Sequence, residues 1–147
     1  MSTAMGATAV PNLIARYAEL VDSGDFAGVG ELFADAVFIG SGEPAEGAAA
    51  VERMLRDTVI RYEDGTPRTH HAVSNLAVEV DEESGVATAR SYVTVFQALP
   101  ESPLQAIAAG RYEDRFARRG GRWGFVERRV RIHLVGDVRA HLRGWSA

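Results

Sequence analysis

Apolar residues recur at helical spacing in the first part of the chain and at strand spacing in the rest. After Pro11 they follow the i, i+3, i+4, i+7 pattern of one helix face. These positions are Leu13, Ile14, Tyr17, Leu20 and Val21. Pro11 suits a first helical position, where its missing N–H does no harm, and Gly24 suits the end of a helix. The pattern predicts a first helix from Pro11 and a flexible tail over residues 1–10.

Two shorter helices and one short strand are expected before residue 64. Asp25 is a candidate N-cap for the second helix, because its carboxylate can accept from the first free N–H groups. The apolar positions of this helix are Val29, Leu32 and Phe33. Val37–Ile39 is a short β-type run that ends in glycine and serine. A third helix is indicated by the spacing of Val51, Met54, Leu55 and Val59.

The remainder of the chain reads as four long strands joined by short turns. The predicted strands cover residues 71–81, 86–99, 105–118 and 122–133. Short turns require antiparallel neighbours, because a parallel pair needs a crossover of a dozen or more residues. Helices followed by strands predict an α+β fold. We expect one domain over residues 11–147, in which a strongly curved antiparallel sheet forms a cone with the three helices on its concave face.

A cone of this kind predicts two surfaces of interest. Its interior can remain incompletely filled by side chains, and such space is where small ligands bind. The opposite, convex face of the sheet carries enough Ala, Val and Tyr to suggest that a second subunit covers it.

Composition removes several classes of chemistry. The 147 residues contain no cysteine, and all 16 basic residues are arginine, so thiolate, Schiff-base and P-loop lysine chemistry are excluded. The four histidines have no metal-ligand spacing, and no glycine-rich loop opens a helix, so we expect neither a metal nor a cofactor. A net charge of −4 argues against nucleic acid as a partner. No apolar run reaches the roughly 18 residues that a membrane span needs, and no signal-peptide pattern is present, which predicts no membrane contact and a cytoplasmic location.

Four segments, in this order and spacing, resemble the SnoaL-like branch of the nuclear-transport-factor-2-like superfamily. They are residues 17–35, 71–81, 87–93 and 110–130, with sequences such as His71-Ala72-Val73-Ser74-Asn75 and Gly110-Arg111-Tyr112-Glu113-Asp114. The resemblance implies a cone with a ligand pocket between helices and sheet, and a homodimer packed through the sheet. It does not imply one reaction, because similar proteins include dehydratases, isomerases, polyketide cyclases and epoxide hydrolases.

Three residues are the catalytic candidates. His71 matches the histidine of the family's His-x-x-x-Asn segment and can exchange a proton near neutral pH. Strand alternation sends His70 to the opposite face, and a register error of one residue would exchange the two. Asp22 matches a first-helix aspartate whose implied role is to orient the histidine, although it lies about 130° from the apolar stripe, where a solvated aspartate is expected. Tyr17 lies inside the stripe and can polarise a carbonyl or serve as a core tyrosine.

A second group is expected to contact the substrate. It consists of Asn75, Tyr92, Arg128, Phe38 and Trp123. For Arg128 the alternatives are a bidentate contact inside the cone, exposure to solvent, or an ion pair with Glu113 or Asp114 across the sheet. Asn75 is also a candidate for strand pairing, and Trp123 for the core. The second long strand lacks the additional histidine or aspartate that dehydratase relatives carry there.

These observations predict a cofactor-independent lyase or isomerase with dehydratase-like acid–base chemistry. Its ligand is expected to be a hydrophobic, oxygenated ring compound, with Tyr17, His71 and Asp22 as the reacting set. Two alternatives remain open. The chain is a non-catalytic ligand-binding or dimerisation module, or it is an accessory subunit resembling the β-subunit of ring-hydroxylating dioxygenases.

Overall fold

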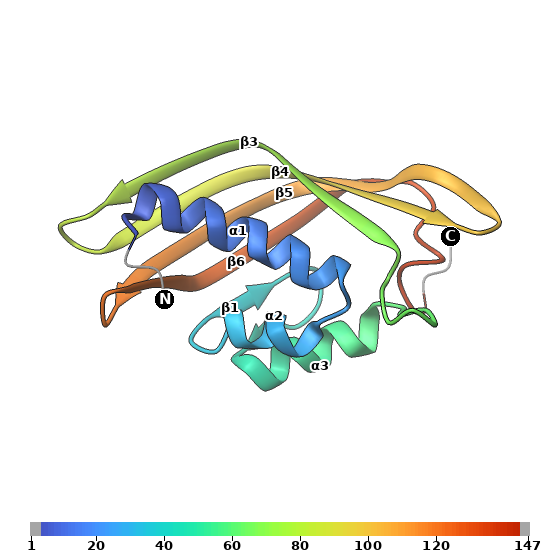
Figure 1. Cartoon of the computed structure of the whole chain (residues 1–147), viewed down its shortest axis with the longest axis horizontal. Helices are drawn as coiled ribbons and strands as arrows, with labels where there is room; N and C mark the ends of the chain where they lie inside the picture. Colours follow the sequence, from blue (N-terminus) through green and yellow to red (C-terminus); the bar gives the residue numbers. More distant parts are fainter. Residues whose placement is uncertain (1–3, 145–147) are drawn as a thin grey trace.

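The computed structural model describes residues 4–144 and has three helices on one side of a curved, open sheet (Figure 1). The helices and strands in chain order are α1 Gly6–Asp22, α2 Phe26–Leu32, β1 Val37–Ile39, β2 Ala45–Glu46, α3 Ala48–Thr58, β3 Thr69–Asp81, β4 Val86–Leu99, β5 Ser102–Arg119 and β6 Arg122–Val135. The sheet order is β2-β1-β6-β5-β4-β3. The predicted α+β architecture is therefore confirmed.

Figure 1 shows how the long strands arch over α1, which runs along their concave side, while α2 and α3 lie together near β1. The four long strands pair antiparallel, as predicted. One pairing differs from a purely antiparallel sheet, because β1 runs parallel to β6. These two strands are separated in the chain by β2, α3 and three long strands, so the crossover that a parallel pair needs is available. The two-residue β2 was not predicted, since it is too short to show a period.

The first helix begins at Gly6, five residues before the predicted start at Pro11. Val10 is fully buried and extends the apolar stripe toward the N-terminus. Pro11 is the sixth residue of this helix, beyond its first turn, so the helix accommodates a proline that lacks the N–H of one intrahelical hydrogen bond. At the start of the helix, the backbone N–H of Gly6 donates to Glu82 Oε2 at 2.7 Å. Residues 6–10 are thus helix, and residues 1–3 of the predicted tail lie outside the described part of the chain.

The core lies between α1 and the inner face of the sheet. Every second residue of β4 is buried from Ala87 to Gln97, which is the alternation expected when one face of a strand packs against helices. Aromatic rings fill the centre of this layer. They are Tyr17, Phe33, Phe38, Tyr112, Phe116 and Phe125, in successive ring contacts with centroids 4.7–6.4 Å apart. Much of the cone that we expected to be partly empty is therefore occupied by aromatic side chains.

Candidate functional site

Asp22 and His71 meet where the end of α1 lies against the start of β3. His71 Nδ1 is 2.6 Å from Asp22 Oδ1, and the His71 backbone N–H donates to Oδ2 at 2.8 Å. The Thr69 hydroxyl donates to Oδ1 at 2.8 Å. Three donors from one strand therefore hold a single carboxylate, and that carboxylate fixes the orientation of the imidazole.

The loop after α1 brings Asp22 to this position. Gly24 has φ of 77°, and a Cβ on it would lie 1.9 Å from the carbonyl oxygen of Gly65. Glycine therefore permits both the left-handed conformation and the close approach of the two loops. The Arg61 guanidinium donates to the Gly24 carbonyl at 3.3 Å. The end of α1 is thus fixed against the segment that leads into β3.

The electrostatics of the pair favour a charged aspartate. Partial burial acts to raise the pKa of Asp22, but the hydrogen bonds and charge of His71, its backbone N–H and the Thr69 hydroxyl together outweigh it, so this pKa lies below the ordinary value. An ionised Asp22 accepts a hydrogen bond from a protonated Nδ1 of His71. Nε2 of the imidazole then carries no proton and is free to accept one. The His71 side chain is 9% exposed and that of Asp22 is 21% exposed, so the pair is not sealed from solvent.

The structure distinguishes between the two adjacent histidines. His70 is exposed on the outer face of the sheet, where its ring lies 6.4 Å from that of Phe96. His71 turns toward Asp22 on α1. The two histidines therefore lie on opposite faces, as alternation predicted, and the structure shows which of them faces inward.

Tyr17 and Arg128 belong to a separate buried cluster deeper in the core. The Arg128 guanidinium makes two hydrogen bonds to Asp114, at 2.8 and 2.9 Å, and both side chains are fully buried. Its central carbon lies 4.4 Å from the Tyr17 ring centroid and 3.6 Å from that of Tyr112. Burial raises the pKa of Tyr17, and the Arg128 charge offsets only part of this rise, so its phenol stays protonated. Nη1 of Arg128 is buried without a hydrogen-bond partner.

Of the other predicted contact residues, only Phe38 lies near these groups. Its ring stacks 6.4 Å from that of Tyr17. Trp123 packs at the opposite end of α1, where a Cβ on Gly6 would lie 3.0 Å from its ring. The 17 residues of α1 place that end about 24 Å from Asp22, so Trp123 lies apart from the Asp22–His71 pair and packs in the core, which was its alternative predicted place.

Tyr92 and Asn75 are also displaced from the expected pocket. Tyr92 is 43% exposed on the outer face, with the Arg111 guanidinium 5.2 Å from its ring. Asn75 is exposed at a β-bulge between Ser74 and Ala77, with φ of 52°. Asparagine tolerates this left-handed conformation better than most residues, so its role is to shape β3.

Sequence reasoning missed His141 as a neighbour of the pair. It is 8% exposed, and its ring centroid is 6.5 Å from that of His71. Burial, with a smaller contribution from His71, lowers the pKa of His141 to about 4. The only signal in the sequence was a histidine after the last strand, which carries no periodicity.

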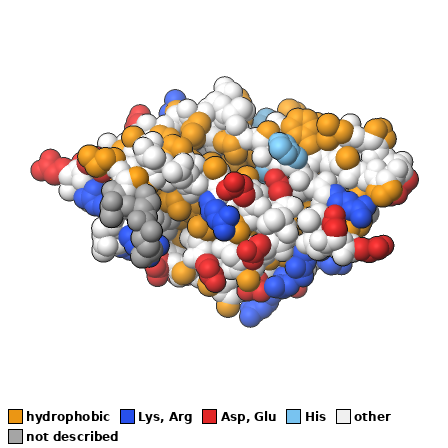
Figure 2. Space-filling model, in the orientation of Figure 1, with side chains coloured by type: hydrophobic (Ala, Val, Ile, Leu, Met, Phe, Trp, Pro, Cys, Tyr) orange, Lys and Arg blue, Asp and Glu red, His pale blue; other side chains and the backbone are white. Residues whose placement is uncertain are grey.

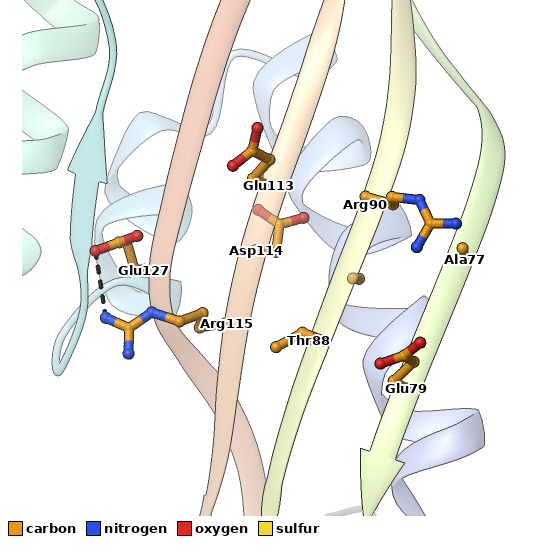
Figure 3. A pocket seen from close by; sticks show the side chains of 9 residues that line it. Ala77, Glu79, Thr88, Arg90, Glu113, Asp114, Arg115 and Glu127 are labelled. Atoms are coloured by element: carbon orange, nitrogen blue, oxygen red, sulfur yellow. Dashed lines mark hydrogen bonds and ion pairs between the residues drawn. The ribbon is translucent and has the colours of Figure 1, made fainter.

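Two surface depressions lie on the outer face of the sheet. The larger, of about 330 Å³, is lined by residues that include Glu79, Arg90, Glu113, Arg115 and Glu127. Figure 3 shows these side chains on the side of the strands opposite the helices, with Arg115 joined to Glu127. Neither depression is lined by the Asp22–His71 pair.

Other kinds of site receive no support from the described residues. Among residues 4–144 no group of three or more His, Cys, Asp or Glu side chains is placed to hold a metal ion. In that same range no helix is both long and apolar enough to span a membrane. The face seen in Figure 2 mixes acidic, basic and apolar side chains without a large area of one charge.

Comparison with solved structures identifies the same fold in other proteins. A nuclear-transport-factor-2-like protein with a cystatin-like fold from Novosphingobium aromaticivorans is 25% identical, with a TM-score of 0.69 over 84% of this chain and 79% of that chain. A candidate scytalone dehydratase from the same organism is 23% identical, with a TM-score of 0.69 over 96% of this chain and 95% of that chain. ActVI-ORFA from Streptomyces coelicolor is 20% identical, with a TM-score of 0.71 over 89% of this chain and 97% of that chain.

No curated protein matches the chain in sequence. The family model of the SnoaL-like domain, however, matches residues 5–129, which include α1, the Asp22–His71 pair and most of the sheet. Together with the shared cone architecture, this match shows that the chain belongs to the family of SnoaL-like domains.

Proposed function

We propose that this protein is a cofactor-independent lyase or isomerase that acts by acid–base chemistry on a hydrophobic, oxygenated ring compound. The observation that carries the proposal is the contact between Asp22 and Nδ1 of His71. A carboxylate on one ring nitrogen fixes the tautomer and makes the other nitrogen an effective proton acceptor.

In this proposal Nε2 of His71 removes a proton from the carbon beside the ligand's carbonyl. The electrons of that C–H bond form an enolate, and Asp22 stabilises the resulting imidazolium. The imidazolium then returns its proton to a hydroxyl on the next carbon. That C–O bond breaks, a C=C bond forms and water leaves, so atoms and charge balance. A reaction that instead returns the proton to a different carbon is an isomerisation.

Tyr17 is the proposed hydrogen-bond donor to the enolate oxygen. Its raised pKa keeps the phenol protonated, as a donor must be. It precedes Asp22 by five residues on α1 and lies deeper in the core, so a ring compound must extend from His71 toward Tyr17. The fully buried Arg128, with Nη1 free of a protein partner, supports binding of a ligand oxygen in this deeper region. The resemblance to a candidate scytalone dehydratase supports the class of reaction.

A second candidate is supported by the packed interior. Aromatic rings occupy the centre of the cone, and the described depressions lie on the outer face. This arrangement favours a non-catalytic binding or dimerisation module, or an accessory subunit like that of ring-hydroxylating dioxygenases. In either version we propose a homodimer packed through the outer face of the sheet, where Tyr92 and Leu134 are 43% and 62% exposed.

The test uses scytalone, a β-hydroxy ketone on an aromatic ring, and follows its dehydration by absorbance. Wild-type protein is expected to turn it over. His71→Asn retains an amide near the Nδ1 position facing Asp22 but has no counterpart of Nε2, so we expect a loss of about 10²–10⁴-fold in kcat with a nearly unchanged melting temperature. His70→Asn, on the outer face, is the matched control and should remain fully active. An active His71→Asn variant removes this histidine from the mechanism, and absence of wild-type turnover favours the non-catalytic module.

A further inference from the structure

The segment that follows β6 carries a buried histidine that the proposed reaction does not yet use. His141 lies beyond residues 5–129, the range that matches the family model. It is 8% exposed, and its Nδ1 is buried with no hydrogen-bond partner. A buried polar atom without a hydrogen-bond partner destabilises the folded chain. Such an atom beside a candidate catalytic pair is where a ligand atom is expected to bind.

The backbone around His141 is fixed on both sides. The Ile60 N–H donates to the His141 carbonyl at 2.9 Å, and the Arg143 N–H donates to the Thr58 carbonyl at 2.9 Å. Leu142 forms an antiparallel bridge with Val59. The end of the chain is therefore joined to the segment that follows α3, so the position of the imidazole is not that of a loose tail.

Two side chains from other elements hold the residue before it. Gln97, buried on the inner face of β4, donates from Nε2 to the carbonyl oxygens of Pro67 and Ala140 at 3.0 and 3.1 Å. The Tyr62 hydroxyl also donates to the Ala140 carbonyl. A buried amide on the sheet thus connects the loop before β3 with the C-terminal segment. This connection brings His141 to the same end of α1 as His71.

The spacing of the two imidazoles suits a shared ligand atom. Their centroids are 6.5 Å apart at an interplanar angle of 67°, an edge-to-face arrangement in which the ring nitrogens are too far apart for a direct hydrogen bond. One oxygen atom bonded to both rings, with two hydrogen bonds of about 2.8 Å each, fits a gap of this size. The titratable groups that act on His141 are His71 and Asp22, and burial keeps the His141 imidazole neutral near pH 7. A neutral imidazole can either donate to or accept from a ligand oxygen.

We propose that His141 is a ligand-contacting residue of the Asp22–His71 site, with Nδ1 making a hydrogen bond to an oxygen of the bound ring compound. The inference rests on the proposed function and adds a specificity element to it. No covalent bond forms at His141. His71 moves the proton, and His141 fixes the oxygen against which the proton is moved.

The test compares three substitutions of one residue with the scytalone assay. His141→Asn places an amide group near the position of Nδ1, His141→Gln places it near that of Nε2, and His141→Leu removes both. If Nδ1 makes the contact, the asparagine variant should retain most of kcat/KM, whereas the glutamine and leucine variants should lose about 10- to 100-fold. His133→Asn, exposed on β6, is the control and should be unchanged. Equal activity of all His141 variants overturns the proposal.

A second measurement does not depend on turnover or on the folding of any variant. Wild-type protein with ¹⁵N-labelled histidine is titrated with α-tetralone, a ring ketone that has no hydroxyl to lose. We expect the His141 Nδ1 resonance to shift on binding while that of exposed His133 does not. A shift without scytalone turnover rejects the catalytic role and retains the ligand contact. Turnover with an unmoved His141 resonance rejects the contact and retains catalysis, and absence of both overturns both proposals.

Discussion

Arg128 and Asp114 face each other from β6 and β5 with fully buried side chains. Burial disfavours the charge on the guanidinium, but the Asp114 carboxylate outweighs it and holds the pKa of Arg128 above its ordinary value. Removing one member of such a pair leaves an uncompensated charge in the core. We predict that Arg128→Met lowers the free energy of unfolding by about 3–5 kcal/mol, measured by urea denaturation.

The double variant Arg128→Met, Asp114→Leu is the control for this prediction. It removes both charges, so it should recover much of the lost stability, because hydrophobic replacement of a buried pair is often close to neutral. If Arg128→Met lowers the free energy of unfolding by less than about 1 kcal/mol, Arg128 and Asp114 are not a buried charged pair of the kind described. From the sequence this ion pair was only one of the alternatives for Arg128, since strand alternation gives the face of Arg128 but not its partner.

His141 should make stability depend on pH between its unfolded and folded pKa values. The ordinary pKa of histidine is about 6.5, and burial lowers that of His141 to about 4. Between these values the unfolded chain binds the proton more readily, so stability falls as pH decreases from 6.5 to 4. The expected loss is on the order of 3 kcal/mol. The free energy of unfolding, measured by urea denaturation at several pH values in this range, should depend less on pH for His141→Leu than for the wild type. An identical pH dependence of the two proteins contradicts the burial of His141.

Asp22 shows why residue roles were harder to predict than faces. Its angle to the apolar stripe of α1 indicated a solvated carboxylate. In the structure the start of β3 reaches over that side of the helix and supplies three donors, so Asp22 is only partly exposed. Helical periodicity describes one helix against one core, and it contains no information about a strand that arrives almost fifty residues later.

At the scale of elements, the bulge in β3 depends on one residue. Asn75 has φ of 52°, and the register with β4 shifts between Ser74 and Ala77. A β-branched side chain is strained in this left-handed region, whereas glycine is not. We predict that Asn75→Val lowers the free energy of unfolding by about 1–3 kcal/mol, while Asn75→Gly changes it by less than half of that. Urea denaturation measures both variants. Equal effects of valine and glycine would mean that Asn75 does not stabilise the chain through the left-handed backbone conformation of the bulge.

The same scale shows which elements the sequence specifies clearly. The predicted limits of β4 match the structure because its alternation of buried and exposed residues is unbroken from Val86 to Gln97. The N-cap of α2 was also predicted, and the Gly28 N–H donates to Asp25 Oδ1 at 2.8 Å. The segment around His141 could not be predicted. Its position is set by Gln97 and Tyr62, whose contacts with Ala140 join distant parts of the chain and leave no local pattern.

At the scale of the whole molecule, the described helices leave the outer face of the sheet uncovered (Figure 1). On this face, neighbouring strands place opposite charges beside one another, as in the pairs Arg90–Glu113 and Arg115–Glu127. Next to these charges it presents Tyr92 and other apolar side chains. Alternating charges with apolar groups form a surface that can match its own copy across a two-fold axis, because each charge has an opposite charge nearby.

We therefore predict that light scattering on the purified chain gives a mass of twice 15.9 kDa. Leu134→Glu, which places a charge on the 62% exposed residue in the apolar part of this face, should convert the dimer to a monomer, since burying an unpaired carboxylate opposes association. Ala27→Glu, an exposed site on α2, adds the same charge on the opposite side of the molecule and should leave the dimer intact. A wild-type monomer, or equal effects of the two substitutions, contradicts assembly through the sheet. Because Asp22 and His71 lie on the helix side of the sheet, we expect scytalone turnover to persist in a monomeric Leu134→Glu variant.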